Sequence, residues 1–368
     1  MNKKSLPLLM VVALVGLVAI FYWMRNEDIA SPVDQQEPLR IAILLPLTGP
    51  GATGAKCSQE GFELALSEIE QDGANVELLF EDTQTNPKTA VSIYQQMQTR
   101  QVPPKVIVPQ LSSVMKALRP MLTEDKLTVS TGVSAPNVVE PSANVYRVFL
   151  TATGIGRTAA QWASEIGLKS LYVVFVNDEY GQSVLNATQE HFEQSGGRIS
   201  SEPFSLLEKD FRIQWQKILQ GNPDGVFITG YGPGYIAVLN QLKELNYPGS
   251  IITDWSITAP DYFKATQGVR NGTFVVTVQA VEDFVRKYED AYGRECSVVN
   301  TGFSYDTLKV IWQAYEASDG TVAGMSDVIR RMDDYPGVMQ TGGFGEDGEL
   351  SINYSVLTVK DDKLIMVE

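Results

Sequence analysis

From Leu39 onward the sequence alternates between short apolar runs and amphipathic stretches with helical periodicity, and this alternation constrains the fold more than any other feature. Short apolar runs bounded by turn residues predict buried strands. The expected strands are 39–45, 76–82, 105–110, 126–130, 170–176, 225–230, 250–253, 273–278 and 354–359. Helical periodicity is clearest in 58–71, 87–98, 181–194 and 281–292. Strands that alternate with helices predict an α/β fold with parallel sheets covered on both faces.

The composition predicts a folded protein of more than one lobe and excludes nucleic acid as a partner. A chain of 368 residues with 44% hydrophobic residues is long enough for two α/β lobes. Its formal net charge of −15 repels a phosphate backbone and offers no release of counterions.

The sequence has only two cysteines, Cys57 and Cys296, and a single histidine, His191. Metal sites built on these residue types need clusters that the sequence lacks, so we expect no metal and no cofactor. No histidine stands ready to activate a nucleophile, and we therefore expect no enzyme. The two cysteines are compatible with one disulfide or with two buried thiols.

The N-terminus carries a targeting signal. Residues 6–24 are free of charge, and Lys3 and Lys4 precede them. This length lies in the range of roughly 17–25 residues that spans a membrane, and preceding lysines favour a cytoplasmic N-terminus. The sequence predicts a cytoplasmic stub and uncleaved signal anchor over 1–25, and a polar linker over 26–38. Cleavage at an atypical site, which would release a secreted protein, is the alternative.

Gly49, Gly51 and Gly54 follow the first strand and formally match the dinucleotide-binding pattern G-x-G-x-x-G. In that pattern the first glycine makes the tight turn directly off the strand. Here three residues intervene, and Pro50 stiffens the glycine run. We therefore expect this loop to bind no dinucleotide.

Hydroxyl side chains follow two successive strands. Ser112 and Ser113 come after strand 105–110, and Ser134 lies in the loop after strand 126–130. Ligands of open parallel sheets bind beyond the carboxyl ends of the strands. A serine at a helix start is often only an N-cap, whereas two such loops together predict a site for an anionic group.

Aromatic residues follow the strands of the middle region. Tyr180, Tyr231 and Trp255 lie just after strand ends, with Asp254 beside Trp255. Aromatic residues are more often core than ligand contacts. Their recurrence at strand ends nevertheless favours a cleft, because small-molecule sites are lined by aromatic rings with a few polar groups.

With these features in place, the stretch from Ile41 to Glu368 resembles the branched-chain amino-acid-binding proteins, which have the type I periplasmic binding fold and serve ABC importers. The segments that carry the resemblance include IAILLPLTGPGATGAKCSQEG, EDTQTNPKTA, VIVPQLSSVMKALRPM, VVFVNDEYGQS and GVFITGYGPG. Their order and spacing, more than any one motif, are typical of the family.

The resemblance implies two doubly wound parallel-sheet lobes joined by three hinge crossings, preceded by the N-terminal transmembrane helix. The crossings would fall near Phe149, Phe274 and Leu350. The resemblance thus implies that lobe 1 comprises residues 39–149 and 275–350, and that lobe 2 comprises residues 150–274 and 351–368.

The resemblance also implies roles for the candidate residues. Ser112 would hold a ligand carboxylate, Ser134 would add a hydroxyl, and Val133 would offer backbone groups. Tyr180 and Tyr231 would close over the ligand from the second lobe.

The sequence departs from the family at three places. Trp255, with Asp254 beside it, stands where members that bind aliphatic amino acids have a glutamate for the ammonium group. Gly54 stands near a common aromatic residue, and Cys57 lacks the family's early disulfide partner near Leu111.

The resemblance implies a solute-binding protein on the outer face of the cytoplasmic membrane, anchored by residues 6–24. It would capture a small polar ligand, an amino acid or a related carboxylate or amide, by hinge closure and deliver it to an ABC permease. The alternative is a ligand-sensing clamp that acts through a separate membrane partner, since we expect no signalling domain in the chain itself.

Overall fold

The computed structural model describes residues 37–266 and 271–367. The signal anchor predicted at 6–24 and nearly all of the predicted linker 26–38 lie outside the described residues. Within the described ranges, no helix has the length and apolar character needed to cross a membrane. Residues Leu39–Glu368 form one compact unit.

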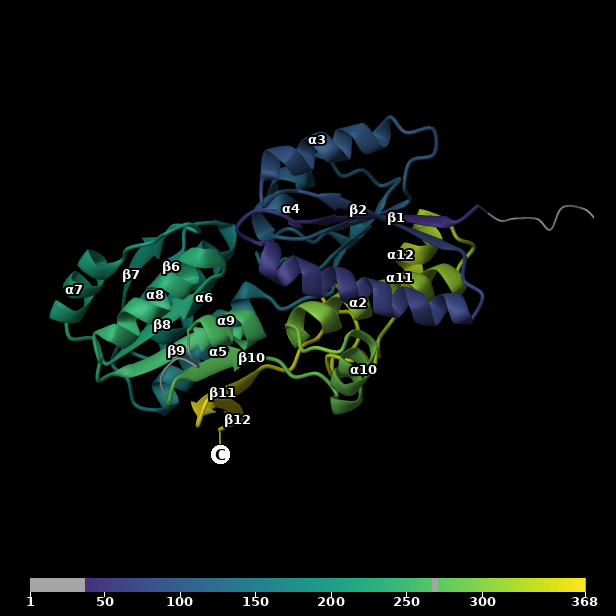
Figure 1. The fold of residues 1–368 in the computed structure, drawn as a ribbon. Helices are drawn as coiled ribbons and strands as arrows, with labels where there is room; N and C mark the ends of the chain where they lie inside the picture. Colours follow the sequence, from purple (N-terminus) through teal and green to yellow (C-terminus); the bar gives the residue numbers. More distant parts are fainter. Residues whose placement is uncertain (1–36, 267–270, 368) are drawn as a thin grey trace, which may run out of the picture. The chain divides into compact units, whose positions relative to one another are not determined.

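The first sheet has five parallel strands in the order β2-β1-β3-β4-β5. Its strands are β1 (Leu39–Leu45), β2 (Val76–Asp82), β3 (Val106–Pro109), β4 (Leu127–Ser130) and β5 (Val145–Arg147). The helices associated with it are α2 (Ala52–Gln71), α3 (Pro87–Gln98), α4 (Ser112–Leu118), α10 (Glu282–Tyr292), α11 (Val298–Glu316) and α12 (Val322–Arg330). Figure 1 shows α3 and α4 on one side of β1 and β2, and α2, α11 and α12 on the other. Both faces of the sheet are covered, as the alternating pattern predicts.

The second sheet has seven strands in the order β12-β11-β10-β9-β8-β6-β7. Its strands are β6 (Ser170–Val176), β7 (Arg198–Phe204), β8 (Gly225–Thr229), β9 (Ser250–Asp254), β10 (Phe274–Thr277), β11 (Ser355–Lys360) and β12 (Lys363–Met366). The helices around it are α5 (Ala152–Glu165), α6 (Glu179–Gln194), α7 (Arg212–Gln220), α8 (Gly232–Glu244) and α9 (Pro260–Ala265). β11 pairs antiparallel with both β10 and β12. The other pairs of this sheet are parallel, as predicted, and a short antiparallel hairpin of β11 and β12 completes one edge.

The chain passes between the two sheets three times: after β5, after β10 and before β11. The first and third passages lie side by side, since the backbone of Arg147 hydrogen-bonds to Gly348 and Leu350. The buried guanidinium of Arg147 also pairs with Glu349. These contacts support the predicted two-lobed α/β fold, while the residue-level lobe boundaries stay a prediction.

Two long helices, α2 and α11, pack against each other beneath the first sheet. Gly61 makes their close approach possible, because a Cβ there would lie 2.3 Å from the carbonyl oxygen of Thr301. The two cysteines form a disulfide between Cys57 of α2 and Cys296, just before α11. Of the two states that the sequence left open, the structure has the disulfide.

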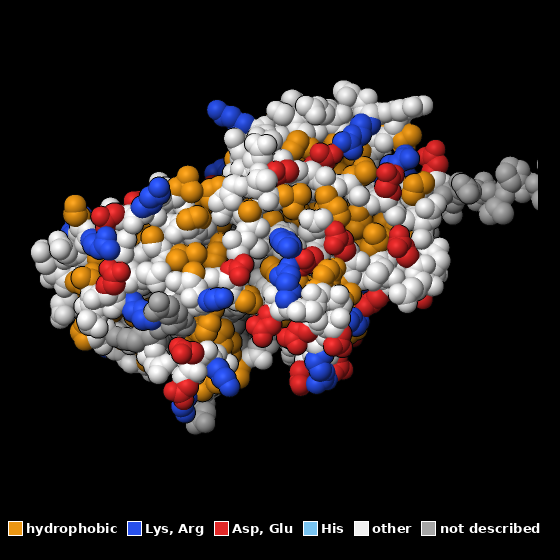
Figure 2. All heavy atoms as spheres, viewed as in Figure 1, with side chains coloured by type: hydrophobic (Ala, Val, Ile, Leu, Met, Phe, Trp, Pro, Cys, Tyr) orange, Lys and Arg blue, Asp and Glu red, His pale blue; other side chains and the backbone are white. Residues whose placement is uncertain are grey.

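Acidic and basic side chains are interspersed on the face of the molecule that Figure 2 shows. Such mixing is typical of an ordinary solvated surface.

Candidate functional site

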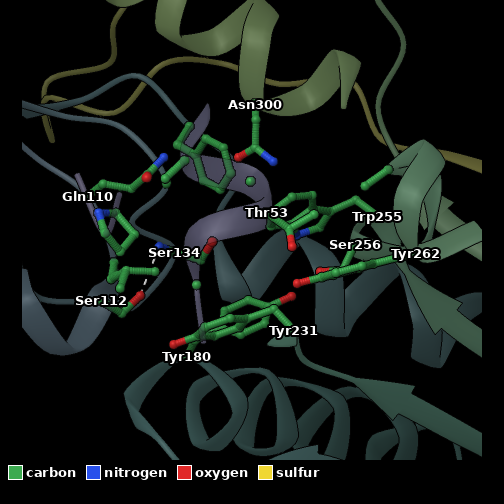
Figure 3. Close-up of a pocket in the computed structure, with 18 residues that line it drawn as sticks. Thr53, Gln110, Ser112, Ser134, Tyr180, Tyr231, Trp255, Ser256, Tyr262 and Asn300 are labelled. Carbon is green, nitrogen blue, oxygen red and sulfur yellow. Dashed lines mark hydrogen bonds between the residues drawn. The ribbon is translucent and has the colours of Figure 1, made fainter. Parts of the chain in front are cut away.

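A cavity of about 660 Å³, including its part open to solvent, lies at the carboxyl ends of strands from both sheets. Figure 3 shows the lining side chains that converge on it. They are Pro46, Gly51, Thr53, Gly54, Ala55, Gln110, Leu111, Ser112, Gly132, Ser134, Phe149, Tyr180, Tyr231, Trp255, Ser256, Ala259, Tyr262 and Asn300.

Ser112 lines the cavity at the start of α4 and organises the neighbouring loop. Its Oγ accepts hydrogen bonds from the backbone N–H groups of Ser134 and Ala135, each at 3.1 Å. An oxygen that accepts twice still has its own proton to donate. The N-cap of α4 is Leu111, in an unusual backbone conformation with φ of 76°, so the N-cap interpretation of Ser112 is wrong. Ser113, one residue further on, does not line the cavity.

Ser134 lines the same side of the cavity as Ser112 and is only 2% exposed. Its carbonyl accepts from the N–H of Ala152, the first residue of α5, at 2.8 Å. This hydrogen bond joins the loop after β4 that carries Ser134, called here the serine loop, to the start of the second lobe. Val133 does not line the cavity, and its carbonyl oxygen accepts from the guanidinium of Arg147 at 3.4 Å.

Two tyrosines of the second lobe form the opposite wall, and each hydroxyl donates to a carboxylate, that of the buried Asp254 or the partly buried Asp178. The hydroxyl of Tyr180 donates to Asp254 Oδ2, and that of Tyr231 donates to Asp178 Oδ2, both at 2.6 Å. The two rings lie 6.3 Å apart between centroids. Burial, together with the neighbouring carboxylate, holds the pKa of each tyrosine well above its ordinary value. The tyrosines therefore stay neutral and contribute their rings to the cavity.

Asp254 supports the site from below and does not line it. The carboxylate is fully buried and, besides Tyr180, accepts from the Thr229 hydroxyl and from the backbone N–H groups of Gly230 and Ser256. Burial raises the pKa of Asp254, and these donors oppose that rise. The structure therefore places Asp254 as the residue that orients Tyr180 and the turn that carries Trp255.

Trp255 and Ser256 line the cavity in the short turn after β9. The Trp255 ring packs edge-on against Phe149, with 5.4 Å between centroids. The indole Nε1 of Trp255 and the Oγ of Ser256 are buried and have no hydrogen-bond partner among the described residues.

Several lining residues were not among those that sequence reasoning selected. The polar ones are Thr53, Gln110, Ser256, Tyr262 and Asn300. Gln110 ends the KVIVPQ run next to the serines and Ser256 follows Trp255, so the same strand-end rule could have selected both. Asn300 belongs to α11, and no local signal connects it with the site. A Cβ at position 54 would lie 2.9 Å from Asn300 Nδ2, so glycine there makes room for the amide.

The glycine loop after β1 serves the cavity in a different way from a dinucleotide loop. Asp82, the last residue of β2, holds it by accepting from the Thr48 hydroxyl at 2.6 Å and the Thr48 N–H at 3.1 Å. Gly51 and Gly54 then place the first turn of α2 along the cavity wall.

None of the described residues that line the cavity has a charged side chain. Over the described ranges, no group of three or more histidine, cysteine or acidic residues could hold a metal ion. The cavity therefore offers hydroxyls, amides, one indole N–H and aromatic rings to a ligand.

The comparisons with known proteins agree with this geometry. A family model described as periplasmic binding protein matches residues 38–363. The leucine-, isoleucine-, valine-, threonine- and alanine-binding protein of Pseudomonas aeruginosa is 23% identical over 240 residues, which cover 62% of this chain and 63% of that protein.

Solved structures share the fold. A leucine-binding protein of Thermotoga maritima superposes with a TM-score of 0.82 at 23% identity, covering 90% of this chain and 98% of that one. A solute-binding protein of an ABC transporter from R. palustris, in complex with benzoate, gives a TM-score of 0.82 at 17% identity, covering 90% and 95%. The family is one of extracytoplasmic solute-binding proteins and not of enzymes. The family model matches nearly the whole described chain, and the two lobes with a cavity at their strand ends agree with it. The chain therefore belongs to the periplasmic binding protein family.

Proposed function

We propose that this protein captures a small carboxylate-containing solute in the cavity between its lobes, and that capture closes the hinge. The proposal rests on one observation: the two lobes contribute different side chains to the lining of the cavity. Lobe 1 supplies the hydroxyls of Ser112 and Ser134, and lobe 2 supplies the rings of Tyr180, Tyr231 and Trp255. A ligand that contacts both walls stabilises the form in which they face each other.

Contacts between the lobes support closure as the relevant motion. Lys116 Nζ of α4 lies 2.5 Å from Glu179 Oε2 of α6. A Cβ at Gly232 would lie 3.3 Å from the carbonyl oxygen of Pro50, so the backbones approach closely. The ion pair is exposed and contributes about 0–1 kcal/mol. A bound ligand must therefore provide most of the preference for the closed form.

For the ligand's carboxylate, the polar wall of lobe 1 offers what burial requires. Removing a carboxylate from water without new hydrogen bonds is costly. The Ser112 hydroxyl and the first turn of α2, which lines the cavity from Gly51 to Ala55, supply donors and the positive end of a helix dipole.

We further propose that the protein is held at the outer face of the cytoplasmic membrane by residues 6–24 and delivers its ligand to an ABC permease. The uncharged length of this segment supports the anchor. Fractionation of cells tests it: the full-length chain should stay with membranes after a salt wash, and a variant that begins at residue 26 behind a cleavable signal should be released. Release of the full-length chain would contradict the anchor.

Calorimetric titration of the full chain with a small carboxylate that it binds tests the capture site. We expect Ser134→Ala to weaken binding by about 1.5–3 kcal/mol, the range for hydrogen bonds to charged groups. The neighbouring Ser113→Ala, outside the cavity, is the matched control and should bind as the parent protein does. Equal affinities for all three proteins would refute this site.

A further inference from the structure

We infer that the ligand carries no ammonium group and instead presents a second oxygen acceptor, in addition to its carboxylate, to the indole N–H of Trp255. This inference rests on the proposed function and specifies the chemistry of the captured solute. The ligand class is then a small oxo or hydroxy carboxylate with an apolar body, and not a free amino acid.

The first observation is an unused donor. Trp255 Nε1 is buried and unpaired among the described residues, in a side chain that lines the cavity. The indole N–H only donates, so it can be satisfied by an oxygen of the ligand and never by an ammonium group. A buried polar group that is left unpaired costs free energy, and such groups in a site point to a missing partner.

The second observation is an unused hydroxyl next to it. Ser256 Oγ is also buried without a partner, and Ser256 is 2% exposed. Figure 3 shows Trp255, Ser256 and Tyr262 on one side of the cavity, Ser112 and Ser134 on the other, and Thr53 between them. The cavity thus has two separate polar ends with aromatic rings between them. One end suits a carboxylate, and the other suits a second oxygen.

The third observation concerns charge. An enclosed ammonium group is costly to bury unless a carboxylate lies beside it. No described residue lining the cavity is acidic. Asp254, which is buried, and Asp178, which is partly buried, do not line the cavity and already accept from the tyrosine hydroxyls. The backbone carbonyls of Gly132 and Ser134 each already accept one hydrogen bond, from the N–H groups of Leu111 and Ala152.

A matched series of ligands tests the inference on the full-length chain by thermal shift and calorimetry. The compounds are leucine, 4-methyl-2-oxopentanoate and 4-methylpentanoate, which share one carbon skeleton and carry an ammonium group, a carbonyl oxygen or neither. We expect the oxo acid to bind about 100-fold more tightly than leucine, since leucine would bury an unpaired charge. Aromatic analogues of the same three types extend the series.

Trp255→Phe identifies the donor, because it keeps a ring and removes only the N–H. The substitution should lower the affinity for the oxo acid about tenfold and change the affinity for 4-methylpentanoate less than twofold. Tightest binding of leucine or of glycine betaine, whose cation aromatic rings attract, would overturn the inference and leave the capture function intact. An equal loss for both acids in Trp255→Phe would likewise overturn it. If no carboxylate in the series binds, the proposed function itself fails.

Discussion

Ser112 should stabilise the folded protein as well as bind ligand, and this dual role gives the sharpest mutational prediction. Its Oγ is the acceptor for two buried backbone N–H groups, those of Ser134 and Ala135. Ser112→Ala leaves both donors without a partner. Each buried, unsatisfied group costs about 1–3 kcal/mol. Because the cavity lets water reach this wall, we expect a loss of about 2–4 kcal/mol in the free energy of unfolding.

Urea unfolding of the unliganded protein measures this loss, with the slope against urea unchanged. Ser113→Ala is the matched control, since it removes the same group one residue away and outside the cavity. The control should stay within about 0.5 kcal/mol of the parent protein. If the two variants are equally stable, Ser112 does not organise the serine loop, and our description of the carboxylate end is wrong.

Three further predictions concern the scaffold. Burial raises the pKa of Asp306 from 3.8 to about 6, so this carboxyl binds a proton more readily in the folded chain than in the unfolded one. Its contribution should therefore lower the free energy of unfolding by about 3 kcal/mol in total as the pH rises from well below 3.8 to well above 6; Asp306→Asn should remove this dependence, and a parent–variant difference that stays constant with pH would contradict it. Reduction of the disulfide, or replacement of both Cys57 and Cys296 by alanine, should cost about 2–4 kcal/mol because the bond closes a long loop, with unchanged melting in reductant as the contrary result. Gly61→Ala should cost about 1–3 kcal/mol in urea unfolding, because its Cβ would meet the carbonyl of Thr301; an alanine at an exposed position of the same helix should cost far less, and equal losses would refute the close packing.

Much of the fold follows from local pattern. The expected strands 39–45, 76–82 and 170–176 have the same bounds as β1, β2 and β6. For β1 and β6 the reason is that mostly buried parallel strands are near-continuous apolar runs. β7 and β12 escaped prediction since they lie at the two edges of the second sheet, where exposure dilutes the apolar signal.

Helix α11 escaped prediction for the opposite reason, its burial. Most of its residues are buried, so it lacks the polar face that reveals a helix by its periodicity. Its Asn300 reaches the cavity through tertiary packing alone, which no local pattern encodes.

At the site, the strand-end rule found five cavity residues: Ser112, Ser134, Tyr180, Tyr231 and Trp255. The rule could not decide which of two neighbours faces the cavity. Asp254 and Trp255 are adjacent, and their roles are separated by the hydrogen bonds that hold the Asp254 carboxylate beneath the site.

The distance between the lobes, measured by electron spin resonance, tests the central claim most directly. Both native cysteines are in the disulfide, so Gln95→Cys on α3 and Gln216→Cys on α7, two exposed positions, can carry spin labels. With the compound that gives the largest thermal shift, we expect the label-to-label distances to narrow to one short population, while the unliganded protein also populates longer distances. Distances that stay the same at saturating ligand would show that binding does not close the hinge.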